Sequence, residues 1–429
     1  MEYIIFFSRY IFVVAIVGFL ISNLILLEWG KNLSIINYGF LAAMHVLSFF
    51  ILVDQIGIIK SISLGLASAI IFIIVLKKFK RILPNTGLVI FNCITFLLDV
   101  GLIILSRIEF GLAVRQFLWI IAGIGLTFFL PVFFRFTFKF KWAANFYILA
   151  GIFLLGMNFL YSRQINGAIN WLSISGLRFQ PSEVLKLIYV FYLGYALGRS
   201  HKNFVMPTIF SSAIILFLVM QKDLGAALIF FVLFSGQMYF ASGNKKIFLG
   251  TIFLIILGFF IGYFVFPHVR ARIISWLNPW ANIKNEGYQI AQSLFAICSG
   301  NIFGSGLTLG FVKYIPVAQS DFIFAAICEE FGNIFSIGII LIFILIILSI
   351  CRILSMCNDD FFAVILNGIM ILTGWQSFLI IGGCIKLIPL TGVTLPFVSY
   401  GGTSLVINIL LLASAIYILV KNYEQIYSA

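Results

Sequence analysis

Acidic side chains are scarce in this chain. Only 14 of its 429 residues are Asp or Glu, and charged residues of both signs make up 10% of the sequence. Soluble globular proteins carry charge on about a quarter of their residues, so this composition excludes a water-soluble protein. The mean hydropathy of +1.16 and the 50 phenylalanines indicate a chain that exposes apolar surface to lipid. The sequence therefore predicts a polytopic membrane protein.

Histidine and cysteine are also few. The three histidines are too scattered for a metal triad. The six cysteines show neither metal-ligand spacing nor a paired framework, so we interpret them as small packing residues. No Walker-type phosphate loop and no soluble nucleotide-binding segment is present, which argues against an ATP-driven transporter.

Long apolar runs follow one another along the sequence. Each is long enough to cross the hydrocarbon core as a helix, and short polar segments separate them. About thirteen spans are predicted, near residues 4–27, 37–53, 57–76, 85–106, 116–134, 143–161, 182–198, 204–220, 224–242, 247–266, 322–350, 361–386 and 402–420. The predicted fold class is all-α, a transmembrane helix bundle with one long extracellular loop at residues 267–320.

Basic residues predict the orientation, because Lys and Arg are retained on the cytoplasmic side. Alternate short loops form a consistent inside set: Lys77, Lys78, Lys80, Arg81, Arg135, Lys139, Lys141, Arg199, Lys202, Lys245 and Lys246. This places the C-terminus in the cytoplasm and the 267–320 loop outside. An odd number of spans would put the N-terminus outside. Anionic lipid of the inner leaflet accounts for the inner basic set.

A second basic set lies on the predicted outer side, where the positive-inside rule does not account for it. Its members are Arg178, Lys186, Lys222, Arg270, Arg272, Lys284, Lys313 and Lys386. Guanidinium and ammonium groups are the usual partners of phosphate and pyrophosphate. We therefore expect an anionic substrate on the outer face.

Four outer segments carry polar chemistry. The first is Gln180-Pro-Ser-Glu183. This pattern is typical of a helix start, because Pro can open a helix and the free amides of the first turn favour a carboxylate. Lys186 lies three residues further on the same helical face, at the membrane border where charge is costly. Two interpretations of Glu183 and Lys186 remain open, a plain helix start and a functional pair. The second segment centres on Asp223, where a helix cap is the commoner role and catalysis the alternative.

The third segment is the predicted 267–320 loop and the run that follows it. Asp321 and Glu329 are eight residues apart, a little over two helical turns, so they could share one face of a helix entering the membrane. Intramembrane carboxylates are functional candidates, and the alternative is a charge network with the outer arginines. The fourth segment, 386–404, interrupts an apolar region with prolines and glycines, which predicts broken backbone that lines a cavity.

Together these segments resemble the SEDS family of bacterial cell-wall proteins, the RodA and FtsW group, from about Asp99 to Ser404. The family's ten-helix core would begin near residue 85, with residues 1–84 as about three additional helices and residues 85–429 as the core. Separate motifs occur in the family's order: Arg107 through Arg115-Gln116-Phe-Leu-Trp119, Asn166-Gly-Ala with Trp171, Gln180-Pro-Ser-Glu183, Asp223-Leu-Gly225, Asn278-Pro-Trp280, Gly287-Tyr-Gln289, Gln292-Ser293, Pro316, Asp321-Phe-Ile-Phe324, Glu329-Glu-Phe-Gly332 and Leu395-Pro-Phe-Val-Ser-Tyr-Gly-Gly402.

The resemblance implies a peptidoglycan glycosyltransferase that polymerises lipid II on the outer face of the bacterial cytoplasmic membrane, in cell-wall biogenesis for cell shape, division or sporulation. A sugar hydroxyl attacks an anomeric carbon and undecaprenyl pyrophosphate leaves. This chemistry needs a general base, and positive charge from side chains or a divalent cation such as Mg²⁺ or Mn²⁺. The partners implied are lipid II, a class B penicillin-binding protein and the lipid bilayer, with no nucleic acid.

The outer basic set, the polar segments and the resemblance together give the candidate site residues. The catalytic candidates are Asn282, Glu286, Asp321 and Glu329. The substrate-binding candidates are Arg178, Gln180, Ser182, Glu183, Lys186, Asp223, Arg270, Arg272, Lys284, Tyr288, Gln289, Gln292, Ser293, Lys313, Lys386, Ser399 and Tyr400.

The chain departs from the family pattern at two positions. Asn282 stands where the family has its proposed catalytic Asp, and an amide cannot accept a proton as a carboxylate can. Asn170 stands where the family usually has Arg before Trp171. Either Glu286 replaces the base, or the chain is a scaffold that binds lipid-linked precursor or its transpeptidase, or the variable loop aligns differently. A precursor flippase is disfavoured by the few charges deep in the cytoplasmic half.

Overall fold

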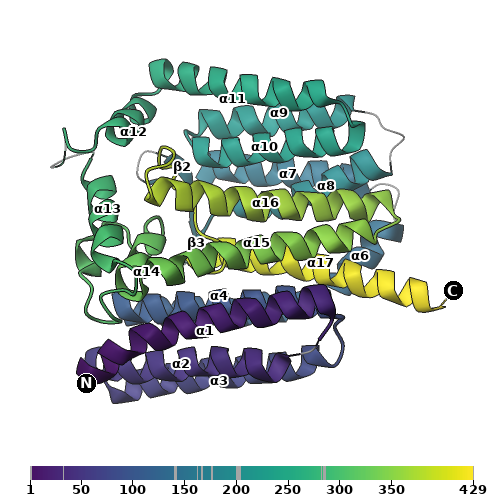
Figure 1. Cartoon of the computed structure of the whole chain (residues 1–429). Helices are drawn as coiled ribbons and strands as arrows, with labels where there is room; N and C mark the ends of the chain where they lie inside the picture. The colour runs from purple at the N-terminus through teal and green to yellow at the C-terminus, as the bar shows by residue number, and fades with distance from the viewer. Residues whose placement is uncertain are drawn as a thin grey trace. The chain divides into compact units, whose positions relative to one another are not determined.

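We describe the fold from a computed structural model. The structure describes residues 2–31, 33–139, 143–161, 163–165, 168–174, 177–199, 204–281, 283 and 287–428. Over these residues the chain forms seventeen α-helices, one short 3₁₀ helix and three short strands (Figure 1). The predicted all-α class is confirmed.

The elements follow one another along the chain with short connections. Before the strands come α1 (Glu2–Trp29), α2 (Ser34–Ile56), α3 (Ile58–Lys80), α4 (Asn85–Ile108), α5 (Phe110–Thr127), α6 (Leu130–Lys139) and α7 (Ala143–Tyr161). The strands are β1 (Arg163–Ile165), β2 (Ala168–Ile174) and β3 (Leu177–Phe179). After them come α8 (Pro181–Gly198), α9 (Val205–Met220), α10 (Leu224–Ser242), α11 (Lys245–Val265), α12 (Pro267–Leu277), α13 (Tyr288–Gly300), η1 (Val312–Tyr314), α14 (Ile323–Phe331), α15 (Asn333–Ser355), α16 (Asp360–Cys384) and α17 (Gly402–Ser428).

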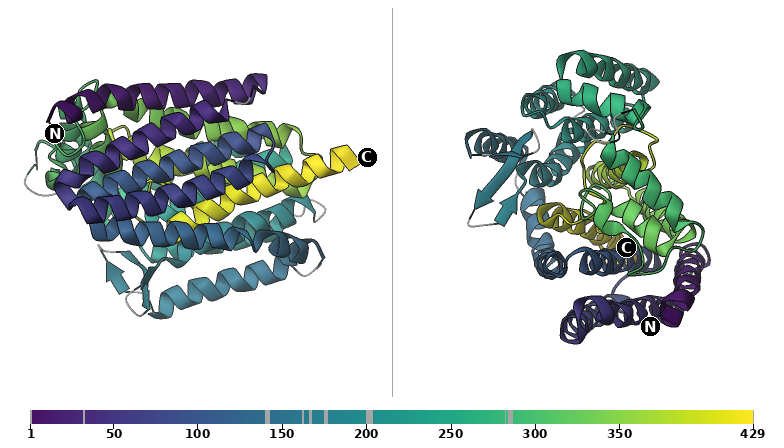
Figure 2. Two further views of the ribbon diagram at one scale, coloured as in Figure 1. Left: turned by 90° about the horizontal axis from the view of Figure 1, so that it is seen from below. Right: turned by 90° about the vertical axis from the view of Figure 1, so that its left-hand side faces the viewer.

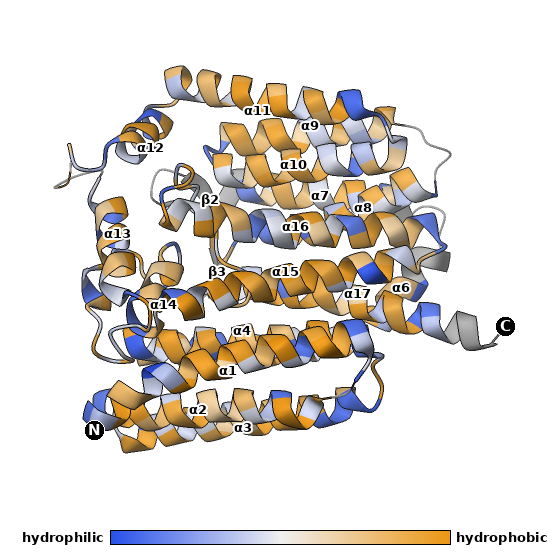
Figure 3. Ribbon diagram, viewed as in Figure 1, coloured by the Kyte–Doolittle hydropathy of each residue, from blue (hydrophilic) through white to orange (hydrophobic). Residues whose placement is uncertain are grey.

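Ten helices of the described chain are long and apolar enough to cross a membrane, namely α1 to α5, α10, α11, α15, α16 and α17. Hydrophobic residues cover most of their length, and hydrophilic residues gather near helix ends and in connections (Figure 3). The chain is therefore an integral membrane protein. The predicted spans at 143–161, 182–198 and 204–220 are also helices, but α7 and α9 carry shorter apolar stretches, and α8 carries charge near its start.

The predicted single span at 322–350 is divided in two by Gly332, which has a φ of +90°. A Cβ atom on Gly332 would lie 2.3 Å from the backbone nitrogen of Gly304, so only glycine fits this approach. The amide of Asn333 then donates to the carbonyl of Asn301 at 3.0 Å. The apolar run gives no sign of this break, because a chain segment distant in the sequence causes it.

The 267–320 segment is more structured than the predicted loop, since it contains α12, α13 and η1. Pro267 opens α12, a position where its missing N–H costs nothing. The polar stretch before α8 also differs from expectation, because it forms an antiparallel sheet of order β1-β2-β3 beside α7 (Figure 2). The predicted span at 116–134 differs as well, since α5 ends at Thr127 and α6 begins at Leu130.

The chain packs as two compact units that alternate along the sequence. The first comprises residues 1–120, 274–349 and 377–401, and the second comprises residues 121–273, 350–376 and 402–429. In the first unit α1, α2, α3 and α4 run side by side (Figures 1 and 2). In the second unit α8 packs against α7, α10 and α17.

Aromatic rings fill the core of the first unit. Phe12 of α1 packs on Phe331 of α14, with ring centroids 4.9 Å apart, and Phe19 packs on Phe96 of α4 at 4.5 Å. All four side chains are buried. The N-terminal helix is therefore part of this core.

Candidate functional site

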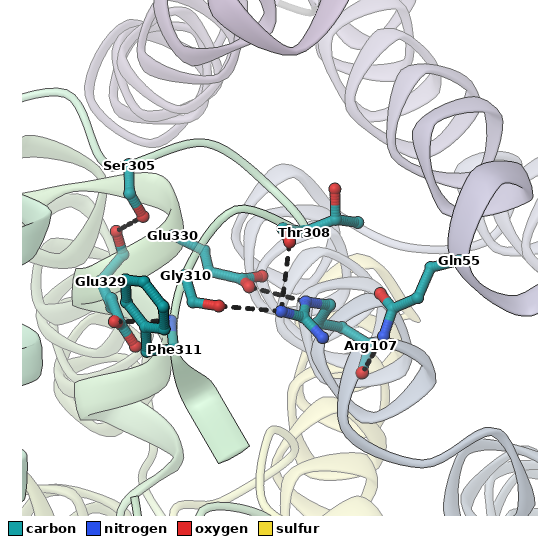
Figure 4. A network of polar contacts seen from close by, with 8 residues as sticks. All are labelled: Gln55, Arg107, Ser305, Thr308, Gly310, Phe311, Glu329 and Glu330. Atoms are coloured by element: carbon teal, nitrogen blue, oxygen red, sulfur yellow. Dashed lines mark hydrogen bonds and ion pairs between the residues drawn. The ribbon is translucent and has the colours of Figure 1, made fainter. Parts of the chain in front are cut away.

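A buried ion pair joins the end of α4 to the end of α14 in the first unit. Arg107 Nε donates to Glu330 Oε1 at 2.7 Å, and the two side chains are 6% and 0% exposed (Figure 4). Arg107 Nη2 also donates to the carbonyl oxygens of Thr308 at 3.2 Å and Gly310 at 3.0 Å. The guanidinium is therefore held by a carboxylate and by the backbone of the segment after α13.

That segment, residues 301–311 and hereafter the 301–311 loop, folds over the last turn of α14. The amide and hydroxyl of Ser305 both donate to the carbonyl of Glu329, at 2.8 Å and 2.7 Å. The amide of Gly306 donates to the carbonyl of Glu330 at 3.1 Å. These bonds satisfy carbonyls that the helix end leaves free.

Glycine is required where the 301–311 loop meets α14. Gly304 has a φ of +85°, and a Cβ atom there would lie 2.3 Å from the carbonyl oxygen of Glu330. Glycine at this position allows the two backbones to touch. The amide of Phe311 then donates to Glu329 Oε1 at 2.8 Å (Figure 4).

Burial acts on both carboxyl groups of α14, which lies outside the ten candidate spans. Burial raises the pKa of Glu330 to about 7, against the opposing effect of the Arg107 charge. Burial also raises the pKa of Glu329, against the bond from the Phe311 amide. Each carboxylate has one oxygen with no hydrogen-bond partner among the described residues. Glu329 and Glu330 thus act mainly to tie the loop and α4 to α14.

Asp321 does not share a helical face with Glu329, contrary to the prediction, because α14 begins only at Ile323. Its carbonyl accepts from Cys384 Sγ at 3.2 Å. The ion pair that α14 forms uses Glu330 and Arg107, neither of which belongs to the charge network weighed for Asp321 and Glu329.

In the second unit, the first turn of α8 carries a buried ion pair. Lys186 Nζ donates to Glu183 Oε1 at 2.7 Å, which confirms that the two share a helical face. Lys186 also reaches Gln376 Oε1 at 3.4 Å. The Ser182 hydroxyl is buried with no hydrogen-bond partner among the described residues.

Asp223 is a helix cap, the commoner of the two roles weighed for it. Its Oδ1 accepts from the amide of Ala226 at 3.1 Å at the start of α10, and Gln180 Nε2 lies 3.5 Å from its Oδ2. Nearby basic groups gather around the start of α12. Burial and the charges of Arg272 and Lys222 lower the pKa of His268.

The 386–404 segment has broken backbone, as predicted, and protein contacts hold it. Ser399 Oγ donates to the carbonyl of Ser320 at 2.6 Å and accepts from the amide of Leu395 at 3.0 Å. The carbonyl of Ser399 accepts from Gln116 Nε2 at 3.0 Å. The Tyr400 amide donates to the carbonyl of Gln319 at 2.8 Å. This segment is thereby fixed to the chain just before α14.

The other predicted site residues lie on α12, α13 and their neighbours. Arg270 and Arg272 are exposed on α12, and the Arg270 guanidinium lies 5.6 Å from the ring centroid of Tyr263. Ser293 is buried on α13, and its hydroxyl donates to the carbonyl of Cys384 at 2.9 Å. Tyr288, Gln289 and Gln292 are on α13, Lys313 is exposed on η1, and Lys386 is half-buried after α16.

Three predicted site residues, Asn282, Lys284 and Glu286, lie outside the described residues. Arg178 belongs to β3, but its side chain is outside what the structure describes. The candidates divide between the two units. The first holds Asp321, Glu329, Tyr288, Gln289, Gln292, Ser293, Lys313, Lys386, Ser399 and Tyr400, and the second holds Gln180, Ser182, Glu183, Lys186, Asp223, Arg270 and Arg272.

Sequence reasoning missed Arg107 and Glu330 as site residues. Arg107 entered only as the start of a motif, and Glu330 only as the neighbour of Glu329. A signal was available, because Arg107 ends a strongly apolar run, where a charge needs a buried partner. In the described part of the chain, no group of three His, Cys, Asp or Glu could hold a metal ion.

Comparisons with known proteins agree on one family. The model of the FtsW/RodA/SpoVE cell cycle proteins matches residues 86–424. Peptidoglycan glycosyltransferase RodA of Mycobacterium tuberculosis is 32% identical over 384 residues, 82% of this chain and 81% of its own length. A probable peptidoglycan glycosyltransferase FtsW of Wigglesworthia glossinidia brevipalpis is 34% identical over 340 residues, 74% of this chain and 89% of its own.

Two solved structures share the fold. A structure of a peptidoglycan synthase complex, described as coordinating polymerization and crosslinking, matches with a TM-score of 0.66 and 22% identity over 78% of this chain and 98% of the matched chain. The rod shape determining protein RodA of Thermus thermophilus matches with a TM-score of 0.57 and 21% identity, over 78% and 96%.

Proposed function

The chain belongs to the FtsW/RodA/SpoVE family of cell cycle proteins, and we propose that it is a peptidoglycan glycosyltransferase that polymerises lipid II into glycan strands. The observation that carries this proposal is the 32% identity over 384 residues to a protein named as that enzyme. The outer face of the bacterial cytoplasmic membrane is the proposed location, with the C-terminus in the cytoplasm. The Lys and Arg residues in alternate connections between helices support this orientation.

The reaction needs a base at the acceptor sugar. The base takes the proton of the attacking hydroxyl, the oxygen bonds to the anomeric carbon, and the bond from that carbon to the pyrophosphate oxygen breaks. We assign the base to Glu286, because Asn282 cannot accept the proton. Glu329 and Glu330 are poor alternatives, since the 301–311 loop and Arg107 occupy them.

Positive charge must stabilise the leaving pyrophosphate. Lys222 and Arg272 lie close enough to His268 for their charges to lower its pKa, together with burial, and Arg270 is on the same helix. This gathering of positive charge supports the role, because it would attract an anion. Glu183 and Lys186 supply a second charged pair at the start of α8. A bound divalent cation such as Mg²⁺ or Mn²⁺ would supply further positive charge for the leaving group.

A class B penicillin-binding protein is the proposed partner. The likeness to a chain from a complex that coordinates polymerization and crosslinking supports this proposal. Crosslinking requires a transpeptidase to act on the strands that the polymerase releases.

The test is polymerisation of purified lipid II by the purified full-length protein, with and without its transpeptidase. Wild type should produce glycan strands, and Glu286→Gln should abolish them. Glu109→Gln is the matched control, because it removes an exposed carboxylate at the end of α4 and should leave the rate unchanged. Strands of equal yield from Glu286→Gln would show that the base lies elsewhere.

A second function, a non-catalytic scaffold that binds lipid-linked precursor or the transpeptidase, is favoured by Asn282 and Asn170 together. The same assay separates it from the enzyme. A wild type that makes no strands under any partner or metal condition, while Asn282→Asp makes them, would establish the scaffold and refute the polymerase.

A further inference from the structure

The helices α1, α2 and α3 precede the family match, which begins at residue 86, yet α1 and α2 contact two parts of the Arg107–Glu330 network. We propose that Arg9 and Gln55 of these helices are positioning residues, which hold the 301–311 loop and the end of α4 so that Arg107 stays on Glu330. The proposal rests on the proposed function, because the network is part of the family core.

The first contact joins the start of α1 to the 301–311 loop. Arg9 Nη1 donates to the carbonyl of Gly304 at 3.1 Å. The ring of Tyr10 packs on that of Phe303, with centroids 5.0 Å apart. A charged donor and an aromatic ring from one helical turn therefore grip two neighbouring residues of the loop.

The same surface of α1 continues along the loop and onto α14. Ile5 is 3% exposed, and its Cγ2 lies 2.8 Å from where a Cβ atom on Gly306 would stand. Phe12 packs on Phe331 at the end of α14. The loop thus lies between α1 on one side and the carbonyls of Glu329 and Glu330 on the other.

The second contact is at the end of α2. Gln55 Nε2 donates to the carbonyl oxygen of Arg107 at 2.9 Å (Figure 4). This carbonyl belongs to the last turn of α4, where carbonyls have no partner within the helix. Gln55 therefore caps α4 at the residue whose side chain forms the ion pair.

The two contacts converge on one residue, Arg107. The 301–311 loop, held by Arg9, presents the carbonyls of Thr308 and Gly310 to Arg107 Nη2. The backbone of Arg107 itself is held by Gln55. Loosening either contact frees one side of the network while the carboxylate of Glu330 remains in place.

Buried polar contacts fix α1 and α2 to α4, so the helices can act as a rigid support. His45 Nδ1 lies 2.6 Å from Asp99 Oδ1, and Asn92 Nδ2 donates to Asn23 Oδ1 at 2.9 Å. All four residues are buried. Polar contacts between helices in a membrane set which residues face each other, since no other partner is available in lipid.

The experiment compares Arg9→Met, Gln55→Leu and the double variant in the full-length protein. Hydrogen exchange of peptides that cover the 301–311 loop reports on the contact of Arg9, and exchange of peptides that cover the end of α4 reports on the contact of Gln55. The rate of strand formation at saturating lipid II reports on the site. Lys77→Met removes an exposed charge from α3 and Ser63→Ala an exposed hydroxyl, so both are matched controls. Arg9→Lys keeps a donor and should restore protection.

We expect loop exchange to rise roughly fivefold in Arg9→Met, the factor for one lost hydrogen bond, and exchange at the end of α4 to rise by a similar factor in Gln55→Leu. Both should rise in the double variant. The maximal rate should fall while KM for lipid II changes little, because positioning is lost and not binding. The unfolding midpoint should stay within the range of the controls.

Two outcomes would overturn the proposal. Loop exchange in the double variant equal to that of the controls would show that α1 and α2 do not hold the loop. Faster exchange with an unchanged maximal rate would show that the contacts of Arg9 and Gln55 do not position the site. The two proposals can also fail separately. If wild type has no polymerase activity but the loop loosens in the variants, the polymerase function is wrong, and Arg9 and Gln55 still hold the loop and the end of α4.

Discussion

At the scale of single residues, two opposing effects act on the carboxyl group of Glu330. Burial disfavours its charged form, and Arg107 favours it at 2.7 Å. Burial prevails, so the pKa rises from the ordinary 4.5 to about 7. In the unfolded chain the carboxyl returns to its ordinary value, which links the ion pair to the pH dependence of stability.

The stability of wild type should therefore fall as the pH rises from about 4.5 to about 7 and then level off. The folded state binds a proton in this window that the unfolded state has released, so raising the pH favours unfolding. The shift corresponds to about 3 kcal/mol. The measurement is the unfolding midpoint of the full-length protein in detergent at several pH values, followed by tryptophan fluorescence.

Glu330→Gln should flatten this slope and leave the part that comes from the raised pKa of Glu329. Its stability should fall below that of wild type mainly above about pH 7, where Arg107 loses a charged partner. Glu109→Gln, an exposed carboxylate near the same helix end, should keep the wild-type slope. A Glu330→Gln profile parallel to that of wild type would refute the assignment.

At the scale of elements, glycine decides how closely α13, the 301–311 loop and α14 can approach. Gly300 ends α13, and a Cβ atom there would lie 1.9 Å from the carbonyl oxygen of Cys328. Neither backbone can move without disturbing a helix. The close packing of α13, the 301–311 loop and α14 therefore depends on glycine at position 300.

Gly300→Ala should destabilise the protein by about 3 kcal/mol or more, since overpacked sites commonly cost 1–3 and this one involves backbone. Gly258→Ala is the matched control, because that glycine lies within α11 with nothing within 4 Å of the added Cβ. It should be neutral or slightly stabilising. The free energy of unfolding in denaturant provides the comparison, and equal values for the two variants would contradict the packing argument.

The helices of the membrane region could be predicted from the sequence, because each follows from an apolar run of sufficient length. The break at Gly332 could not, since the residues that require it are about thirty positions earlier, at 302–304. Arg107 and Glu330 are separated by 223 residues, and no local pattern reports such a pair. Spacing did predict the contact of Glu183 with Lys186, because they are neighbours on one helix turn.

At the scale of the whole molecule, the two packed units do not follow the order of the chain. Each is assembled from three separate stretches of sequence. The division into residues 1–84 and 85–429 remains a prediction about the family core. The orientation in the membrane, which rests on the distribution of basic residues, can be tested with cysteines that the chain already has.

Cys298 on α13 and Cys351 near the end of α15 are both exposed. If the 267–320 segment is outside, a membrane-impermeant maleimide should label Cys298 in intact cells and should reach Cys351 only after permeabilisation. Labelling lost in Cys298→Ser and retained in Cys351→Ser would identify the reacting thiol. Labelling of Cys351 in intact cells would reverse the proposed orientation.

The contact between Arg9 and Gly304 also limits how early the first unit can assemble during synthesis of the protein. The two residues are 295 positions apart. At about 5–20 residues per second, the ribosome needs about 15–60 s to make the second after the first. For most of that interval all of α1 has been made, while the loop that it contacts does not yet exist. Assembly of the first unit therefore waits for the last third of the chain, whatever the speed at which α1, α2 and α3 associate.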